Sequence, residues 1–234
     1  MPRPAFLRRL ACGLALLSVS CVPGPGDWVP GPEAGPAGMS AEAWSHGLAA
    51  YNRASVEGRT RSPLLTIIDF SLPSNQRRLW VVDIGTGEVL ATEHVAHGVR
   101  SGGLYSVSFS NRDGSNQSSL GTFVTARSYW GVRGLSLRLK GLEPGINDRA
   151  MARGIVLHGT PSVSETRARQ GAIGRTEGCP AVSMEAARRL VPLLEDGVVV
   201  FAWYPDRTLL ARSAYLDPFM AEVARQGIRV TGGI

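Results

Sequence analysis

Short apolar runs separated by glycine-rich turns dominate the chain from about residue 64 onward. The segment LLTIIDF, which begins at Leu64, has the pattern of a short buried strand, and RLWVVDIGTGEVLATEHVA predicts two strands joined at Gly85-Thr86-Gly87. Four further segments have the same character: GTFVTARSYW, LSLRLKG, GIVLHG and GVVVFAWYP. The pattern therefore predicts a mainly β domain.

A helix is expected immediately before this β body. Ser40 is a predicted N-cap, and Trp44, Leu48 and Tyr51 follow as an apolar stripe at spacings of four and three residues. This spacing favours a helix of three to four turns that packs by its stripe. His46 points away from the stripe and is expected at the surface.

Two more helices are indicated toward the C-terminus. Ser183 can cap a helix that Pro192 ends or bends. A last helix is signalled by Asp217 at the cap, Pro218 at the first position and Gly227 past the end.

Residues 98–119, GVRSGGLYSVSFSNRDGSNQSS, form a long passage rich in Gly, Ser and Asn with at most one weak strand. A loop of this length in a compact domain is more often functional than idle, and disorder is the competing interpretation. The 234 residues contain no internal repeat and no second core, so one domain with extended termini is predicted.

The N-terminal residues resemble a secretory signal. Three arginines precede an apolar stretch that ends at Val19, and this stretch is too short to span a bilayer. A signal peptide over residues 1–20 predicts export to the periplasm or cell envelope. Cys21 is a candidate for lipidation and hence membrane anchoring, although Ser18 stands where lipoprotein signals usually have Leu, so simple cleavage stays open. Residues 21–39 are rich in Pro and Gly and predict a linker.

Charge changes the picture little. The formal net charge of +6 falls to about +3 when Arg3, Arg8 and Arg9 leave with the signal peptide, which has no acidic residue. The remaining arginines are scattered rather than clustered, and Lys140 is the only lysine. A nucleic-acid partner therefore has little support, while an anionic polymer remains open.

Cys179 is the residue that suggests chemistry. Loss of Cys12 with the signal, and acylation of Cys21, would leave Cys179 without a disulfide partner in an oxidising compartment. His158 ends the strand segment GIVLHG and is followed, after seventeen residues, by Thr176-Glu177-Gly178-Cys179. A cysteine nucleophile needs a base beside it, because a free thiol is only slightly ionised at neutral pH.

Two structural alternatives compete with a catalytic cysteine. Cysteine is often buried in cores, but the neighbouring Gly178 and Pro180 favour a turn. A zinc site is weaker, because one cysteine and one histidine leave two ligands unnamed.

The motif of His, seventeen residues, then Thr-x-Gly-Cys resembles the signature of the murein L,D-transpeptidase catalytic domain family (YkuD-like). The blocks RLWVVDIGTGEVL, FSNRDGSNQSSLGTF and GRTEGCPAV are similar to that family as well. The resemblance implies a mainly β fold, a β-sandwich or barrel of mixed sheets with a few flanking helices. The implied catalytic domain spans residues 64–204, with an N-terminal helix and lead-in over 40–63 and a C-terminal helical extension over 205–234.

The resemblance also implies roles for residues of the motif. Cys179 would be the nucleophile, His158 its general base, and Gly178 part of an oxyanion-forming turn. Thr176 stands where the family has Ser or Thr and would orient the site or contact substrate through its hydroxyl.

The sequence departs from the family at two positions. Glu177 stands where many members have His, and Ala181 where many have Arg or Asn, so how the substrate carboxylate or amide is bound is left open. The remaining substrate-contact candidates are Arg175, Arg153, His97 and Ser119. For the two arginines a solvated surface role is the alternative, and for His97 a structural one.

The function implied is attack by Cys179 on a peptidoglycan tetrapeptide stem and transfer of the acyl group to an amine, which forms a 3→3 cross-link without a metal or organic cofactor. An L,D-carboxypeptidase, or a Cys/His peptidoglycan hydrolase or amidase, is the enzymatic alternative. The common hydrolases of the latter kind place Cys before His in the chain, whereas His158 comes first here. The third hypothesis is a non-catalytic cell-wall-binding lipoprotein.

Overall fold

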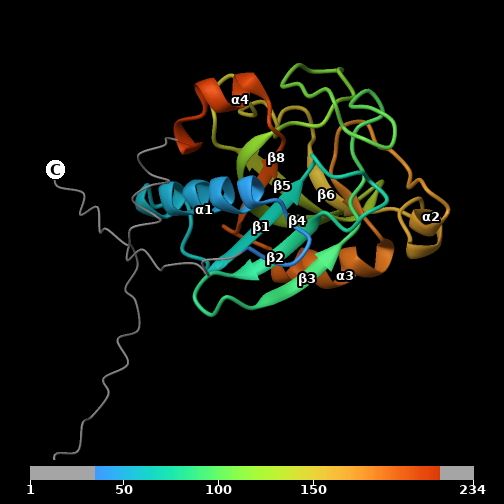
Figure 1. Ribbon diagram of the computed structural model, residues 1–234, viewed down its shortest axis with the longest axis horizontal. Helices are drawn as coiled ribbons and strands as arrows, with labels where there is room; N and C mark the ends of the chain where they lie inside the picture. Colours follow the sequence, from blue (N-terminus) through green and yellow to red (C-terminus); the bar gives the residue numbers. More distant parts are fainter. Residues whose placement is uncertain (1–34, 217–234) are drawn as a thin grey trace, which may run out of the picture.

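One mixed sheet of eight strands organises the computed structural model, which describes residues 35–216 (Figure 1). The strands are β1 (Leu64–Asp69), β2 (Leu79–Asp83), β3 (Val89–Glu93), β4 (Gly121–Gly131), β5 (Gly134–Gly141), β6 (Val156–Gly159), β7 (Ala181–Val182) and β8 (Val199–Trp203). The helices are α1 (Ala41–Val56), α2 (Glu165–Arg169), α3 (Met184–Leu193), α4 (Arg207–Arg212) and the 3-10 helix η1 (Ala214–Leu216). Every strand segment expected from the sequence forms a strand.

Several expectations lie outside the described residues. They are the signal peptide over 1–20, the lipidation candidate Cys21, most of the 21–39 linker and the helix expected after Asp217. Within residues 35–216, none of the helices is long and apolar enough to cross a bilayer.

The sheet curls so that its two edges meet. The strand order is β3-β2-β1-β8-β4-β5-β6-β7, with parallel pairs β1–β8 and β6–β7 and antiparallel pairs elsewhere. Ala96, three residues beyond β3, bridges antiparallel to Ala181 in β7 through N–H···O bonds of 2.7 and 3.4 Å. The predicted mainly β fold is confirmed as a single mixed sheet that nearly closes into a barrel with a few flanking helices.

The β2–β3 hairpin forms where the turn residues predict it. The Asp83 carboxylate accepts hydrogen bonds from the amides of Gly85 and Thr86 at 2.8 and 3.1 Å, and its carbonyl accepts from Gly87. Gly87 has φ of +75°, a conformation that favours glycine. The carboxylate therefore fixes the turn, and the glycine completes it.

Helix α1 lies across β1 and β8, at the end of the molecule opposite α2 (Figure 1). Ser40 caps it as predicted, because its hydroxyl oxygen accepts from the Ala43 amide at 3.2 Å, and the same hydroxyl donates to Asp69 at 2.7 Å. A Cβ at Gly47 would lie 2.4 Å from the Ile67 side chain, so this glycine lets the helix approach the sheet closely. The helix thus shares the core of the β body.

The expectation that His46 lies free at the surface is wrong. Its ring stacks on the Trp203 ring with centroids 4.5 Å apart, and its Nδ1 is buried. The close approach of α1 brings positions beside the apolar stripe into contact with the sheet as well.

Ser183 caps α3 as predicted, with its hydroxyl oxygen accepting from the Ala186 amide at 3.0 Å. Helix α3 includes Pro192 and ends one residue later, at Leu193, close to the expected end. The helix packs on β6 and β5, where a Cβ at Gly159 would lie 2.9 Å from Ala187.

A buried arginine anchors the residues before the long 98–119 passage. Arg78 is 0% exposed, and its guanidinium donates to the carbonyls of Val95 and Leu72 at 2.9 and 2.8 Å and to the Ser106 hydroxyl at 3.3 Å. It also donates to Nδ1 of His97 at 2.8 Å. The passage follows an irregular path that these contacts fix, so the interpretation as disorder is wrong.

We predict that Arg78→Met lowers the free energy of unfolding by about 3 kcal/mol or more, because the buried carbonyls of Val95 and Leu72 lose their donor. Urea denaturation followed by circular dichroism measures the change. Arg77→Met is the matched control, since that side chain is about half exposed and pairs with exposed Glu165; its cost should stay below about 1 kcal/mol. Equal costs for the two variants would contradict the prediction.

Candidate functional site

Strand register brings the predicted base beside the segment that carries the predicted nucleophile. His158 in β6 pairs with Ser136 of β5 on one side and with Ala181 of β7 on the other. Cys179 lies two residues before Ala181, in the turn that leads into β7. The β6–β7 pair is thus the scaffold on which the imidazole and the thiol are placed.

The imidazole of His158 is held as a neutral base. Its Nδ1 lies 2.9 Å from the Gly159 carbonyl, which can only accept, so Nδ1 carries the proton and Nε2 keeps its lone pair. Burial lowers the pKa of His158 against the raising effect of that hydrogen bond. Nε2 is buried, and none of residues 35–216 donates to it.

The thiol of Cys179 is likewise neutral at rest. The residue is 5% exposed, and Sγ donates to the Gly154 carbonyl at 3.6 Å rather than to His158. Burial raises the pKa of Cys179, against smaller opposing effects that include the positive charge of Arg133. It is the sole free cysteine in the part of the chain that the structure describes. Thiol and imidazole are therefore not a preformed ion pair.

A hydroxyl closes the turn that carries the cysteine. Thr176 Oγ1 donates to the Cys179 carbonyl at 2.7 Å and accepts from the Gly178 amide at 3.1 Å. The Gly178 amide is therefore occupied, contrary to the expectation that it points at an oxyanion. The Cys179 amide has no acceptor among the described residues. Of the amides of Gly178 and Cys179, that of Cys179 is therefore the open one.

The 98–119 passage forms one wall of the turn. Ser118 Oγ donates to the Gly178 carbonyl at 3.1 Å and accepts from the Gly98 amide at 3.0 Å. Gly178 has φ of +125°, and a Cβ there would lie 2.8 Å from the Gln117 carbonyl oxygen. Glycine is required at this position both by its backbone conformation and by the close wall.

Arg153 and Ser119, both expected to contact substrate, are structural parts of this wall. Four groups of the passage accept from the Arg153 guanidinium, at 2.5 to 3.1 Å: the carbonyls of Ser110 and Gln117 and the hydroxyls of Ser115 and Ser119. Ser119 in turn donates to the Ser110 carbonyl. Burial lowers the pKa of Arg153, yet its charge still favours the thiolate of Cys179.

Arg175 and His97 meet at a different point, the carbonyl of Gly102. Arg175 donates to this carbonyl at 3.2 Å, and Nε2 of His97 lies 3.3 Å from it. His97 is 0% exposed, and burial, together with the charge of Arg78, lowers its pKa to about 4. His97 therefore does not line the cleft and has the structural role that was its alternative.

Arg133 is a residue near the site that no sequence pattern indicated. It lies in the β4–β5 turn, three residues before Ser136, the β5 partner of His158. Its guanidinium lies 2.5 Å from the Glu177 carboxylate, and its charge acts on both His158 and Cys179. Only the pairing of β5 with β6 brings residue 133 here, so no local pattern could have indicated it.

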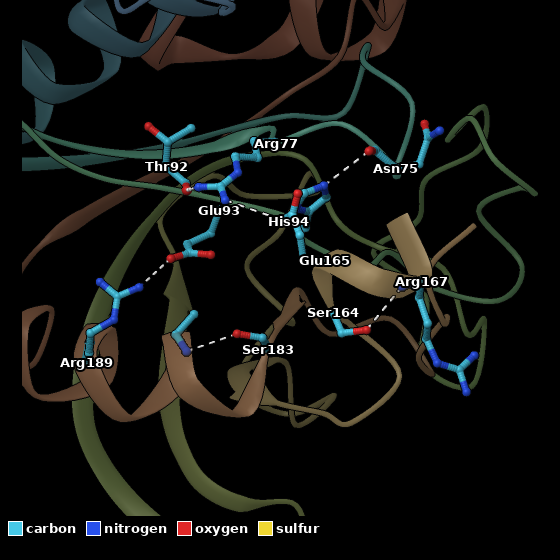
Figure 2. Close-up of polar contacts among 11 residues, drawn as sticks. Asn75, Arg77, Thr92, Glu93, His94, Ser164, Glu165, Arg167, Ser183 and Arg189 are labelled. Atoms are coloured by element: carbon cyan, nitrogen blue, oxygen red, sulfur yellow. Dashed lines mark hydrogen bonds and ion pairs between the residues drawn. The ribbon is translucent and has the colours of Figure 1, made fainter. Parts of the chain in front are cut away.

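A polar cleft of about 360 Å³ lies away from the cysteine turn, between β3, α2 and α3 (Figure 2). Ion pairs join Arg189 to Glu93 at 2.5 Å and Arg77 to Glu165 at 3.3 Å, and His94 contacts the Asn75 carbonyl at 3.1 Å. Both arginines that line this cleft are thus paired with carboxylates, and the carboxylate of Glu185 lines it as well. No group of three or more His, Cys, Asp or Glu suited to hold a metal occurs within residues 35–216. The Cys179 region therefore remains the candidate active site.

Comparison with known families decides the assignment. The family model described as L,D-transpeptidase catalytic domain matches residues 36–203, most of the chain. The chain belongs to the L,D-transpeptidase catalytic domain family. The resemblance inferred from the His158 and Cys179 motif is thereby confirmed. A search of curated proteins gave no match.

Solved L,D-transpeptidases are distantly similar to this family member. An L,D-transpeptidase from Mycobacterium smegmatis is 15% identical with a TM-score of 0.39, over 61% of this chain and 59% of that one. An L,D-transpeptidase from Xylanimonas cellulosilytica is 15% identical with a TM-score of 0.36, over 69% and 78%. A variant of the helical cell shape determining protein Pgp2 from Campylobacter jejuni is 14% identical with a TM-score of 0.39, over 78% and 62%. The chain spans about three-fifths of the length of the first relatives.

We predict that Gly178→Ala lowers the free energy of unfolding of this transpeptidase domain by about 2 kcal/mol, because the new Cβ meets the Gln117 carbonyl at a backbone angle that disfavours side chains. Gly171→Ala is the control: φ there is +95°, but no atom lies within 4 Å of the added Cβ. Denaturant unfolding should show a smaller cost for the control. A larger cost at Gly171 would refute the role assigned to the wall.

We also predict that alkylation of Cys179 by iodoacetamide, in a background with Cys12→Ser and Cys21→Ser, follows an apparent pKa above the ordinary thiol value of 9.0, because burial disfavours the thiolate. The rate, measured by intact mass from pH 6 to 11, should rise throughout the neutral range. A fast, pH-independent plateau at neutral pH would instead indicate a preformed thiolate–imidazolium pair.

Proposed function

We propose that this chain is a cell-envelope L,D-transpeptidase that uses Cys179 as its nucleophile on peptidoglycan stem peptides. The observation that carries the proposal is the buried, unpartnered Nε2 of His158, on the strand whose register faces the cysteine turn. A lone pair without a donor inside a protein is costly, and a thiol proton would satisfy it. Family membership supports the same chemistry.

In the first half-reaction, Sγ of Cys179 leaves the Gly154 carbonyl and attacks the carbonyl carbon of the third residue of a donor tetrapeptide. The thiol proton passes to Nε2 of His158 during attack, because the resting pair is neutral. The bond to the terminal D-Ala breaks, its amine takes the proton from His158, and a thioester remains.

In the second half-reaction, a side-chain amine of a neighbouring stem attacks the thioester carbonyl. Nε2 of His158 accepts a proton from this amine and returns it to the departing sulfur. The product is a 3→3 cross-link, and the free thiol is restored. Water in place of the amine would give L,D-carboxypeptidase activity.

Backbone and turn contacts support this assignment of roles. The open amide of Cys179 is the donor for the developing oxyanion, a type of contact that contributes about 2.7 to 4 kcal/mol to transition-state stabilisation. Thr176 holds the turn closed through its two hydrogen bonds, so the cysteine amide and thiol keep fixed directions.

The proposed substrate fits export of the chain. Peptidoglycan lies outside the cytoplasmic membrane, and the first twenty residues have the composition of a secretory signal. Acylation of Cys21 would tether the domain, through the Pro/Gly-rich linker, to the membrane beneath its substrate. Periplasmic location and the lipid anchor are parts of the proposal.

We predict that the purified chain converts disaccharide tetrapeptides into cross-linked dimers that have lost one D-Ala, as detected by mass spectrometry. Cys179→Ala should abolish the product, because no acyl acceptor remains. His158→Gln should reduce the rate by about 100-fold or more, the usual contribution of a general base.

Product type separates the competing functions. Clipped monomer without dimer would favour the carboxypeptidase, and cleavage at another bond would favour a hydrolase or amidase. An unchanged substrate with the well-folded wild-type chain would overturn the enzymatic proposal and favour a wall-binding protein.

A further inference from the structure

Two of the three arginines near the cysteine turn are already engaged by backbone. The Arg153 guanidinium donates to the carbonyls of Ser110 and Gln117 in the 98–119 passage, and Arg175 donates to the Gly102 carbonyl. Arg133 differs, because its partner is a single side chain, the carboxylate of Glu177. Among these three cations, Arg133 is the one whose partner can move away.

The position of Arg133 is open to a ligand. It lies at the tip of the β4–β5 hairpin, where the neighbouring Trp130 and Val132 are 79% and 106% exposed. The side chains of Arg133 and Glu177 are 40% and 69% exposed. An ion pair this exposed contributes little to stability, so an incoming carboxylate can replace Glu177 at small cost.

Arg133 is also close enough to act on the reacting groups. Its positive charge lowers the pKa of Cys179 and of His158, and Glu177 opposes it at Cys179. Glu177 is two residues before Cys179 in the chain, so the ion pair adjoins the turn that carries the sulfur.

We propose that Arg133 binds a carboxylate of the donor stem peptide and that Glu177 occupies Arg133 until this carboxylate displaces it. The inference rests on the proposed function and names the residue that recognises the donor. The stem has two candidate carboxylates, that of the terminal D-Ala and that of the diaminopimelate side chain. A guanidinium binds either in the same two-pronged way.

Release of Glu177 has a consequence for the chemistry. While Glu177 pairs with Arg133, the two charges act in opposite directions on the pKa of Cys179. The donor carboxylate takes over this neutralising role only when the stem is bound. The ion pair therefore makes Glu177 a competitor for the donor, and its removal should strengthen donor binding while loss of Arg133 weakens it.

The test measures kcat and KM for dimer formation with three donors: the natural tetrapeptide, the same stem with a D-Ala carboxamide, and the same stem with an amidated diaminopimelate side chain. Arg133→Gln should raise KM for the natural donor about tenfold, as expected for loss of one charge-assisted hydrogen bond. Amidation of the recognised carboxylate should raise the wild-type KM similarly and have no further effect in Arg133→Gln. The donor that behaves in this way identifies the carboxylate.

Two further variants should change KM in opposite directions, a result that a folding defect does not produce. Glu177→Gln should lower KM for the natural donor severalfold, because the internal competitor is gone. Arg133→Lys should fall between wild type and Arg133→Gln. Arg127→Gln is the matched control, since Arg127 is an exposed arginine on the same hairpin, and it should leave KM unchanged.

The inference would be overturned if Arg133→Gln raised KM by the same factor for the natural donor and for both amidated donors. A raised KM in Glu177→Gln would overturn it as well. If the wild-type chain is active and Arg133→Gln has the same KM for the natural donor, this inference alone is overturned. No product from the wild-type chain would instead overturn the proposed function and this inference with it.

Discussion

Closure of the sheet at Ala96 and Ala181 is the constraint on which the rest of the structure depends. This bridge joins the chain after β3 to β7, the two edges of the curled sheet, and a second bridge joins Gly98 to Thr176 just beyond it. The segments that follow on either side, the 98–119 passage and the cysteine turn, must therefore lie against each other. An open sheet of the same strands would leave them apart.

Contact between those two segments turns ordinary loop residues into a shaped site. Ser118 joins the Gly98 amide to the Gly178 carbonyl, and the Gln117 carbonyl lies where any side chain at position 178 would extend. Arg153 fixes the far part of the passage by four hydrogen bonds. The wall is thus built from backbone carbonyls and hydroxyls, and its rigidity comes from donors that lie elsewhere in the chain.

Burial then sets the chemistry of His158 and of the thiol in the turn that leads into the neighbouring strand. Desolvation favours the neutral forms of both Cys179 and His158, so the thiol rests on a carbonyl and the imidazole keeps an unused lone pair. A nucleophile of this kind is activated as it attacks, not in advance. The positive charges of Arg133 and Arg153 favour the thiolate and so offset part of the cost of burial.

The sequence by itself determined the strands, the β2–β3 turn, the caps at Ser40 and Ser183, and the family through its His158 and Cys179 motif, because each of these follows from residues close together in the chain. Periodicity, a capping hydroxyl and a glycine turn are local properties. Tertiary structure alone decided which groups are free to act. Arg153 is committed to carbonyls and hydroxyls of the 98–119 passage, and His97 to the Arg78 guanidinium and the Gly102 carbonyl. The Gly178 amide is taken by Thr176, and Arg133 reaches Glu177 across forty-four positions. Hydrogen-bond and ion-pair partners depend on which strands pair, and a local pattern does not encode that pairing.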